Sequence, residues 1–382
     1  MRVLVAHNAY QQRGGEDMVV EAEVALLREH GHEVDLLQRH NDELASISAA
    51  SAAMQTLWSA RTGDEMRARV RRFRPQVVHV HNTFPLLSPS LYWACAAERV
   101  PVVQTLHNFR LACPQAMFLR EGRVCEDCLG RAPLPALRHA CYRGSRAQTA
   151  VLVGMLSLHR SLGTWQRKIA LYIALNEFSR RKFIAAGLPP ERVVVKPNFV
   201  AAPALDDVPR AGFVFVGRLS EEKGVATLVQ AWRQAALDAE LHVAGIGPQR
   251  GLLEGVLRLA PLGALPLTEV QSLMACSLAL VLPSICYENF PRTLVEAFGA
   301  GLPVIASRIG ALAELVSDGQ TGLLFEPGDA ASLADRLAWA QAHPAEMRRM
   351  GQRARAVYDA EFTPARNLEL LLAIYGRAST KS

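Results

Sequence analysis

Residues 283–305 read PSICYENFPRTLVEAFGAGLPVI, and this stretch carries two glutamates eight positions apart. Glu288 lies in a turn that follows an apolar strand predicted over residues 278–282. Glu296 lies about one turn inside a short helix that follows the turn. One carboxylate is therefore expected on a loop at the end of a strand, and the other inside the adjoining helix.

The limits of this short helix are marked by its sequence. Pro291 is typical of a helix start, and Gly301 followed by Pro303 is typical of a helix end. The first turn of a helix presents unbonded N–H groups and the positive end of the helix dipole. This segment therefore suits a phosphate group, with a carboxylate on each side to bind sugar hydroxyls.

Strand-like apolar segments alternate with helical patterns along the whole chain. The predicted strands lie at 3–6, 33–37, 77–80, 102–105, 169–175 and 193–196, then at 213–216, 241–244, 278–282, 304–306 and 322–325, with a Pro/Asp-rich linker at 201–210 between the two sets. Apolar strands that alternate with helices indicate parallel sheets covered on both faces. A chain of 382 residues suggests two domains, so two such sheets joined near residue 200 predict two Rossmann-like domains with ligand sites at the carboxyl ends of their strands.

The net charge of +6 is unevenly distributed. Residues 1–197 hold 26 Lys and Arg against 17 Asp and Glu, a balance of +9, whereas residues 198–382 hold 16 against 19, a balance of −3. A basic half favours an anionic surface, either nucleic acid or a membrane leaflet, and an ordinary solvated surface is an equal alternative. No apolar run reaches the roughly 18 residues of a membrane span, and the first residues read as a strand, so a cytoplasmic protein is expected.

A second motif lies at residues 213–224, FVFVGRLSEEKG. It combines a buried strand, a turn at Gly217, and two cations five positions apart, Arg218 and Lys223. The planar guanidinium and the ammonium group could converge on one anion. The alternative is a solvated pair of cations at the start of a helix.

Taken together, these motifs resemble the family-4 retaining glycosyltransferases of the GT-B fold, from Val3 to about Asp329. The resemblance implies an α/β protein with two Rossmann-like domains whose parallel sheets face each other across a cleft. The acceptor domain would span residues 1–200 and the nucleotide-sugar donor domain residues 201–361. A C-terminal helix at about 362–377 would pack back onto the first domain.

The activity that the resemblance implies is retaining transfer of a sugar, of the hexosyltransferase type, from a nucleotide-diphosphate sugar. The acceptor would be a glycan or a lipid-linked acceptor, with a role in cell-surface polysaccharide synthesis and no nucleic acid partner. The basic balance of residues 1–197, and not the resemblance, predicts peripheral contact with an anionic membrane. No Asp-x-Asp pair follows a strand, so no cofactor is expected to be required for catalysis.

The resemblance also assigns roles to particular residues. The catalytic residues would be Arg218, Lys223, Glu288 and His107. Many members of the family carry Glu-Gly-Phe-Gly where this chain has Glu288 followed by Asn-Phe-Pro, a departure that bears on which sugar fits. The donor-binding residues would be Gly14, Gly15, Gly217, Gly245, Asn289, Phe290, Pro291, Thr293, Leu294 and Glu296.

Histidines and glycines mark the first domain. Gly14 and Gly15 open a helix after the first strand and resemble the glycine turn that faces the diphosphate and the acceptor. His107 ends a strand and matches the histidine that approaches the donor sugar. His81 also ends a strand, whereas His79 lies inside it, so His81 is the better candidate for the acceptor side.

Four cysteines lie within 29 residues in the pattern Cys-x11-Cys-x2-Cys-x12-Cys. The surrounding segment is rich in Gly, Pro and Arg, which is typical of an insertion. In a cytosolic chain this spacing favours thiolates around a structural zinc over disulfides or a redox Cys-x-x-Cys. The predicted zinc ligands are Cys113, Cys125, Cys128 and Cys141.

Two other functions fit the same motifs. A nucleotide-sugar epimerase of the same fold would act on the donor alone. A non-catalytic scaffold would bind the nucleotide sugar without turnover. The presence of all four charged positions in the second domain argues against both.

Overall fold

The computed structural model describes residues 1–202 and 208–380, so residues 203–207 of the predicted linker lie outside the described part. The chain divides into two compact units. The first unit contains Met1–Met117, Glu126–Pro197 and the residues from Asn367 onward, and the second contains Phe118–Cys125 and Asn198–Arg366.

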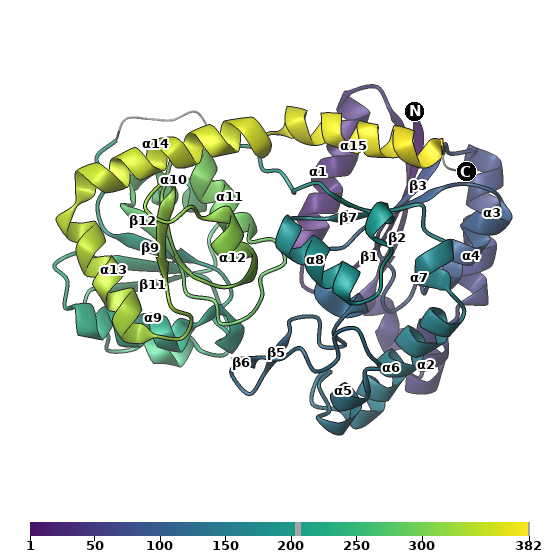
Figure 1. The fold of residues 1–382 in the computed structure, drawn as a ribbon, viewed down its shortest axis with the longest axis horizontal. Coiled ribbons are helices and arrows are strands. Elements are labelled where there is room, and N and C mark those ends of the chain that lie inside the picture. Colours follow the sequence, from purple (N-terminus) through teal and green to yellow (C-terminus); the bar gives the residue numbers. More distant parts are fainter. Residues whose placement is uncertain (203–207, 381–382) are drawn as a thin grey trace. The chain divides into compact units, whose positions relative to one another are not determined.

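The first unit is built on a six-stranded sheet in the order β2-β1-β3-β4-β7-β8, in which every pair is parallel. Its strands are β1 (Arg2–Ala9), β2 (Glu33–His40), β3 (Val77–Asn82), β4 (Val102–Thr105), β7 (Leu171–Ala174) and β8 (Val193–Val195). Its helices are α1 (Gly15–Glu29), α2 (Ala49–Leu57), α3 (Ala60–Phe73), α4 (Ser90–Ala97), α5 (Leu134–Arg138), α6 (Arg146–Ser161), α7 (Thr164–Arg167), α8 (Glu177–Ala185) and most of α15 (Pro364–Ser379). Helices cover both faces of the sheet (Figure 1).

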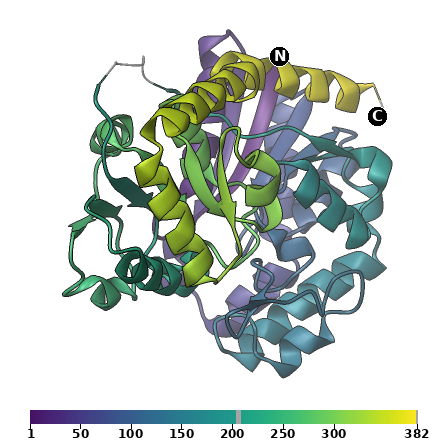
Figure 2. The same ribbon diagram turned by 60° about the vertical axis from the view of Figure 1, so that its left-hand side comes forward.

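The second unit repeats this architecture with the order β11-β10-β9-β12-β13-β14, again all parallel. Its strands are β9 (Phe213–Val216), β10 (Leu241–Ala244), β11 (Leu259–Gly263), β12 (Ala279–Leu282), β13 (Val304–Ser307) and β14 (Gly322–Phe325). Its helices are α9 (Val225–Ala235), α10 (Leu267–Cys276), α11 (Arg292–Gly299), α12 (Gly310–Leu315), α13 (Ala330–Ala342) and α14 (Pro344–Glu361). The turned view in Figure 2 shows α13 and α14 lying against this sheet. A short hairpin of β5 (Leu119–Arg120) and β6 (Arg123–Val124) also belongs to this unit.

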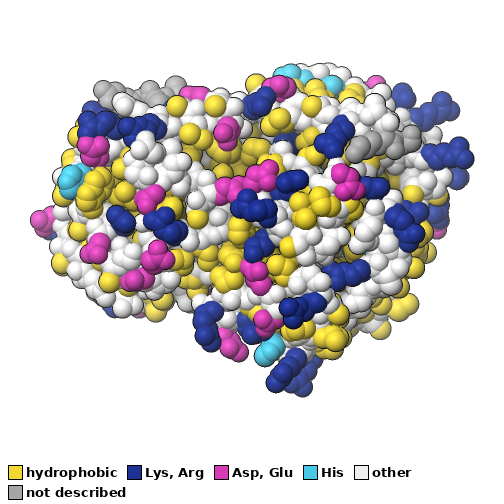
Figure 3. Space-filling model, viewed as in Figure 1, with side chains coloured by type: hydrophobic (Ala, Val, Ile, Leu, Met, Phe, Trp, Pro, Cys, Tyr) yellow, Lys and Arg dark blue, Asp and Glu magenta, His cyan; other side chains and the backbone are white. Residues whose placement is uncertain are grey.

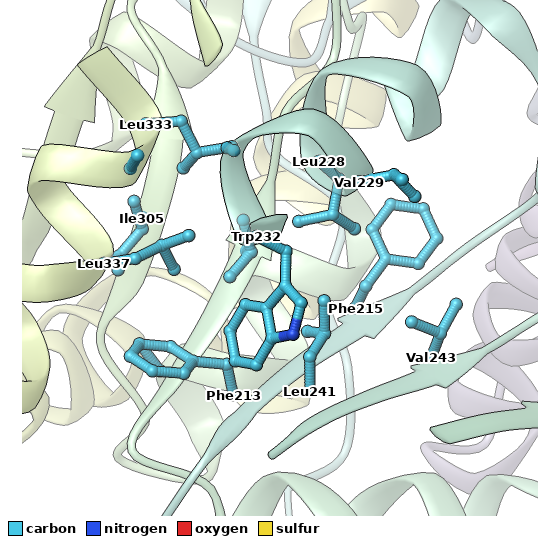
Figure 4. Packing of buried hydrophobic residues seen from close by; sticks show 14 of the residues in the cluster. Phe213, Phe215, Leu228, Val229, Trp232, Leu241, Val243, Ile305, Leu333 and Leu337 are labelled. Carbon is cyan, nitrogen blue, oxygen red and sulfur yellow. The ribbon is translucent and has the colours of Figure 1, made fainter. Parts of the chain in front are cut away.

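The core of the second unit follows from strand alternation. On β9, Phe213 and Phe215 point to one face and Val214 to the other, and all three are fully buried. The two phenylalanines pack with Trp232 of α9 and Leu337 of α13, as Figure 4 shows. A sheet with two apolar faces needs helices on both sides, and this requirement fixes the three-layer fold.

The order of the strands indicates where each sheet is expected to bind a ligand. In each sheet the chain first builds outward on one side and then crosses to the other, so a switch point lies between β1 and β3 and another between β9 and β12. Open parallel sheets bind ligands outside the carboxyl ends of the two strands that flank this point. The segments that follow these strands are the ones singled out by sequence.

The predicted α/β class with two parallel sheets is confirmed, and all eleven predicted strands are present with ends within a few residues. The sequence reasoning missed β11, which is an edge strand bonded only to β10 and contains Pro261. Proline lowers the strand signal, and it is tolerated at a sheet edge because its missing N–H donor can face the side that has no second partner strand. The predicted C-terminal helix is present as α15, which begins at Pro364.

No helix in the described part of the chain is long and apolar enough to cross a bilayer. Lys and Arg side chains are scattered over the face shown in Figure 3, with Asp and Glu among them. Four arginines of α3, the most basic helix by sequence, form ion pairs with carboxylates: Arg67 with Asp64, Arg69 with Asp35 and Glu65, Arg71 with Glu98, and Arg72 with Asp35. These pairs offset most of the positive charge of that helix.

Candidate active site

Helix α11 begins where its sequence predicts. Its N-cap is Pro291 and it spans Arg292–Gly299, directly after the loop that leaves β12. Leu294, Val295, Ala297 and Phe298 are completely buried and hold the helix against the sheet. The first turn of the helix therefore lies at the switch point of the second unit.

Glu296 lies on this helix with its side chain only 11% exposed. Burial raises the pKa of Glu296, and the Arg292 guanidinium, whose Nε lies 3.0 Å from Glu296 Oε1, partly opposes that shift. A largely desolvated carboxylate of this kind can accept two hydroxyl donors at once.

Glu288 forms the centre of a tight polar cluster in the preceding loop. Its Oε1 accepts hydrogen bonds from the Lys223 ammonium at 2.6 Å and from the Ser284 hydroxyl at 2.6 Å. Burial alone would raise the pKa of Glu288, but the charge and hydrogen bond of Lys223, with help from Ser284, more than offset it, and the net pKa is lowered. The pKa of Lys223 is raised, because the pairing with Glu288 outweighs the burial that opposes it. Both groups are therefore charged at neutral pH.

Arg218 is held by a different carboxylate. Its Nη2 donates to Glu222 Oε1 at 2.6 Å, and the Ser220 hydroxyl donates to the same oxygen at 2.6 Å. The side chain of Arg218 is 63% exposed, while that of Glu222 is 12% exposed. The charge of Arg218 still contributes to lowering the pKa of Glu288, so both cations act on the same region. Their convergence on one bound anion stays a prediction.

Two glycines let the backbones of neighbouring turns approach each other closely at the carboxyl end of the second sheet. Gly245 has φ +154°, and a Cβ there would lie 1.8 Å from the carbonyl oxygen of Gly217. Gly224 has φ +70°, and a Cβ there would lie 1.8 Å from the carbonyl oxygen of Pro283. The turn after β10 thus touches the turn after β9, which a lone Gly-x-Gly in the sequence could not show.

The remaining residues predicted to bind the donor occupy different environments. The ring of Phe290 packs edge-on to Phe362 at a centroid distance of 6.2 Å. The side chain of Leu294 lies wholly within the core, so it can contribute only backbone to a ligand. Asn289 is buried, and Thr293 is partly exposed on the first turn of α11.

In the first unit, Gly14 and Gly15 lie at the start of α1 as predicted. The Gly14 N–H donates to Asp17 Oδ2 at 2.8 Å, and the other Asp17 oxygen lies 2.8 Å from His7 Nε2. Gly14 is the N-cap, and a Cβ on Gly15 would meet nothing within 4 Å. The carboxylate of Asp17 therefore already satisfies one N–H at this helix start.

His81 and His107 are brought together at the ends of β3 and β4. His81 Nδ1 lies 2.8 Å from His107 Nε2, and the rings are stacked with centroids 5.1 Å apart. Burial, followed by the charges of neighbouring histidines, holds the pKa of both rings well below the usual range. His79 instead points into the unit, where its ring nitrogens contact the hydroxyls of Thr105 at 2.8 Å and Tyr375 at 2.7 Å.

A small cavity of about 40 Å³ opens beside these rings. His81, Asn82 and His107 line it together with the loop that contains Phe84, and Arg110 stacks over the Phe84 ring at 4.6 Å. The pairing of His81 with His107 was not foreseen from the sequence, although both were predicted at neighbouring strand ends.

The four cysteines lie in the segment between β4 and α6, and each is intermediate in exposure. Cys125 directly follows β6, and its N–H donates to the carbonyl oxygen of Phe118 at 2.8 Å. Cys128 is followed closely by Gly130, which has φ +71°. A zinc site at these residues stays a prediction.

Comparison with known proteins agrees with this geometry. Residues 13–202 match the model described as Glycosyltransferase Family 4, and residues 210–342 match the model described as Glycosyl transferases group 1. The chain belongs to the family-4 glycosyltransferases, and its fold is GT-B.

Individual relatives differ in coverage. The glycogen synthase of Mycobacterium tuberculosis is 36% identical over 167 residues, which is 40% of each chain, so the alignment spans well under half of that relative. The 2-deoxystreptamine glucosyltransferase of Streptomyces kanamyceticus is 29% identical over 307 residues, 76% of this chain and 74% of the relative. The structure of Anabaena Alr3699/HepE in complex with UDP matches with a TM-score of 0.69 and 17% identity, over 98% of this chain and 100% of that chain.

The residues that sequence reasoning missed are buried charges. Glu222 supports Arg218, and Glu23 and Lys196 lie together beneath the histidines. One signal was available: Glu23 lies among Val19, Val20, Val24 and Leu27 on the buried stripe of α1, where a carboxylate is costly unless it is paired.

Proposed function

We propose that this chain is a retaining glycosyltransferase that moves a sugar from a nucleotide-diphosphate sugar to a hydroxyl group of a glycan or lipid-linked acceptor. The observation that carries the proposal is the switch point of the second unit. There, two largely buried carboxylates, Glu288 and Glu296, lie just before and inside α11, and the cations Lys223 and Arg218 are each paired with a carboxylate.

These groups suit transfer with a diphosphate leaving group. Lys223, Arg218 and the N–H groups of α11 would stabilise the charge that develops on the diphosphate as the glycosidic bond breaks. Such fixed donors need no reorganisation during the reaction, so each can lower the barrier by about 2.7–4 kcal/mol. Glu288 would contact the donor sugar, and Glu296 would hold the ribose hydroxyls. The acceptor would then attack from the same face, and the anomeric configuration is retained.

The donor and acceptor classes follow from chemistry and from the relatives. The Anabaena neighbour was solved with UDP, so UDP-sugars head the list of donors to test. The names of the relatives point to glycan and aminocyclitol acceptors. If the acceptor is a glycan, the protein would act in the synthesis of cell-surface polysaccharide.

The experiment combines binding with turnover. Thermal shift against nucleoside diphosphates and their sugars identifies the donor, since a ligand at 100-fold its Kd adds about 2.7 kcal/mol of stability. Product analysis then follows with a panel of glycan and lipid-linked acceptors, in the presence and absence of a chelator of divalent cations.

Sugar transfer with retained anomeric configuration, undiminished by the chelator, is the expected result. Isomerised nucleotide sugar without any acceptor would instead indicate an epimerase. Tight donor binding with no turnover on any acceptor would indicate a binding protein.

A further inference from the structure

A chain of buried polar side chains runs beneath the His107 pocket in the first unit. The Lys196 ammonium donates to Glu23 Oε1 at 2.5 Å and to Asn367 Oδ1 at 3.1 Å. The other oxygen of Glu23 lies 3.5 Å from His81 Nε2, a close approach without hydrogen-bond geometry. Within the described residues neither of these two buried atoms has a hydrogen-bond partner, so they face each other as unsatisfied groups. His81 Nδ1 then lies 2.8 Å from His107 Nε2. The chain thus leads from an ion pair in the core to the candidate catalytic histidine.

Ligand atoms of Glu23, His79 and His81 lie within 4.8 Å of one another, which is a spacing that a metal ion could use. Two contacts argue against a metal here. The Lys196 ammonium already supplies the positive charge beside Glu23, and both ring nitrogens of His79 have hydroxyl partners. The cluster is better explained as a chain of donors and acceptors.

The direction of that chain follows from what each group can do. A neutral imidazole has one N–H and one lone pair, and a carboxylate can only accept. Burial keeps both imidazoles neutral by holding their pKa values low. His81 Nε2 therefore carries the proton that faces Glu23, which leaves His81 Nδ1 as an acceptor. His107 Nε2 must then donate to it, so the lone pair of His107 is on Nδ1.

We propose that Glu23, acting through His81, fixes His107 as the Nε2–H tautomer, so that Nδ1 is left to accept a hydrogen bond from a hydroxyl group of the bound sugar. This assignment rests on the proposed function only for the identity of the ligand. No hydrogen bond within the described part of the chain occupies His107 Nδ1, and His107 is partly exposed on the cavity wall. Glu23 and His81 are positioning residues, because they act on the substrate only through His107.

Glu23→Gln should reverse the direction of the hydrogen bonds that run from residue 23 through His81 to His107. Lys196 is a donor only, so it selects the amide oxygen of the new side chain, and the amide NH₂ is then directed at His81 Nε2. That nitrogen becomes an acceptor, and its proton moves to Nδ1. His81 then donates to His107 Nε2, and the proton of His107 is displaced to Nδ1. The nitrogen that faces the pocket changes from acceptor to donor.

Long-range ¹H–¹⁵N correlation spectra of the full chain with ¹⁵N-labelled histidine report this directly. His81→Gln and His107→Gln assign the two sets of signals among the eleven histidines. In the wild type, both rings should be Nε2–H tautomers, and in Glu23→Gln both should be Nδ1–H tautomers. Wild-type His107 protonated on Nδ1 overturns the proposal, and this outcome does not depend on whether Glu23→Gln folds.

Kinetics provide the functional arm, with Glu29→Gln as the matched control, since Glu29 is exposed on the same helix. Glu23→Gln should lower kcat by about 10- to 100-fold, the usual cost of one misplaced polar contact, with KM changed little. Wild-type kcat in a variant whose tautomers have reversed overturns the role assigned to Nδ1. If no nucleotide sugar is turned over by the wild type, the proposed function fails, while the spectra still decide the tautomer.

Discussion

At the scale of single residues, the two cations of the second unit are not equivalent. Arg218 is 63% exposed and Lys223 only 28% exposed, and Lys223 shares its carboxylate with a serine. Both are expected to stabilise the leaving diphosphate, but only Lys223 has a mostly buried side chain. Substitution should therefore separate chemistry from stability.

Arg218→Ala should lose most turnover, about 100-fold or more, and should lower the free energy of unfolding by no more than about 1 kcal/mol, because the exposed guanidinium can be replaced by water beside Glu222. Lys223→Ala should lose similar turnover and also destabilise the second unit by about 1–3 kcal/mol, since it leaves Glu288 buried without its partner. Steady-state kinetics and urea unfolding measure the two effects. As a control, Glu288→Gln combined with Lys223→Ala should recover part of the stability and none of the activity. Near-normal turnover in both single variants would remove the cations from the mechanism.

Glu16 should make stability fall as pH rises. Burial raises the pKa of Glu16 to about 8, and its carboxyl accepts a hydrogen bond from the Tyr10 hydroxyl at 2.9 Å. The folded protein therefore retains a proton that the unfolded chain releases at about pH 4.5. The contribution of Glu16 to stability is complete below that pH and is lost as the pH approaches about 8.

The measurement compares unfolding of the wild type with that of Glu16→Gln and of the exposed control Glu29→Gln at pH 5, 7 and 9. Glu16→Gln should gain stability relative to the wild type with each step, whereas the difference for Glu29→Gln should stay flat. A constant difference for Glu16→Gln would show that its carboxyl titrates normally.

At the scale of elements, replacing glycine by alanine in two of the turns should affect stability differently. Gly245→Ala should destabilise the second unit by more than about 2 kcal/mol, because its Cβ would lie 1.8 Å from the carbonyl oxygen of Gly217 and its φ is +154°. Gly15→Ala should be neutral or stabilising by up to about 1 kcal/mol, because the new methyl group meets nothing within 4 Å. Thermal and chemical unfolding of both variants test the contrast. Equal losses would mean that the turn after β10 can relax.

The cysteine segment is expected to hold one zinc ion. Its four thiols have a spacing typical of structural zinc in cytosolic proteins. Elemental analysis of protein purified without chelator should give about one zinc per chain, and Cys125→Ser with Cys128→Ser should abolish it. Cys276→Ser is the matched control, since Cys276 is an exposed thiol outside the segment. Well under one zinc per wild-type chain would reject the site.

The features that the sequence predicts are those decided by residues close together along the chain. Pro291 and Gly301 mark the limits of α11 to within two residues, because capping is decided by neighbours along the chain. The hydrogen bonds of Lys196 to Glu23 and to Asn367 join residues 173 and 171 positions apart, and no periodicity encodes them. The same holds for the pairing of His81 with His107, which depends on β3 and β4 being neighbours in the sheet.

At the scale of the whole molecule, the charge balance of +9 in residues 1–197 supports a prediction of reversible contact with an anionic membrane. Since the arginines of α3 are mostly paired, the attraction must come from basic residues spread over the first unit. Each basic group near an anionic leaflet contributes about 1 kcal/mol, and salt screens exposed charges over about 8 Å.

Co-sedimentation with vesicles of anionic or neutral lipid, at low and high salt, measures this contact. Binding should require anionic lipid and weaken as salt rises. Equal partitioning onto both kinds of vesicle at low salt would exclude electrostatic attachment and favour an acceptor in solution.

The path of the chain limits how the protein can be divided into fragments. Residues from Asn367 onward belong to the first unit, although α14 before them belongs to the second. A fragment that ends at Pro197 would lose Asn367, which contacts Lys196, and Tyr375, which contacts His79. Two buried polar groups would be left exposed to solvent or unsatisfied, and an apolar groove would open where α15 packs. Expression of the first unit as an independent module therefore requires its last helix to be supplied, either as a separate peptide or by joining that helix to the new end.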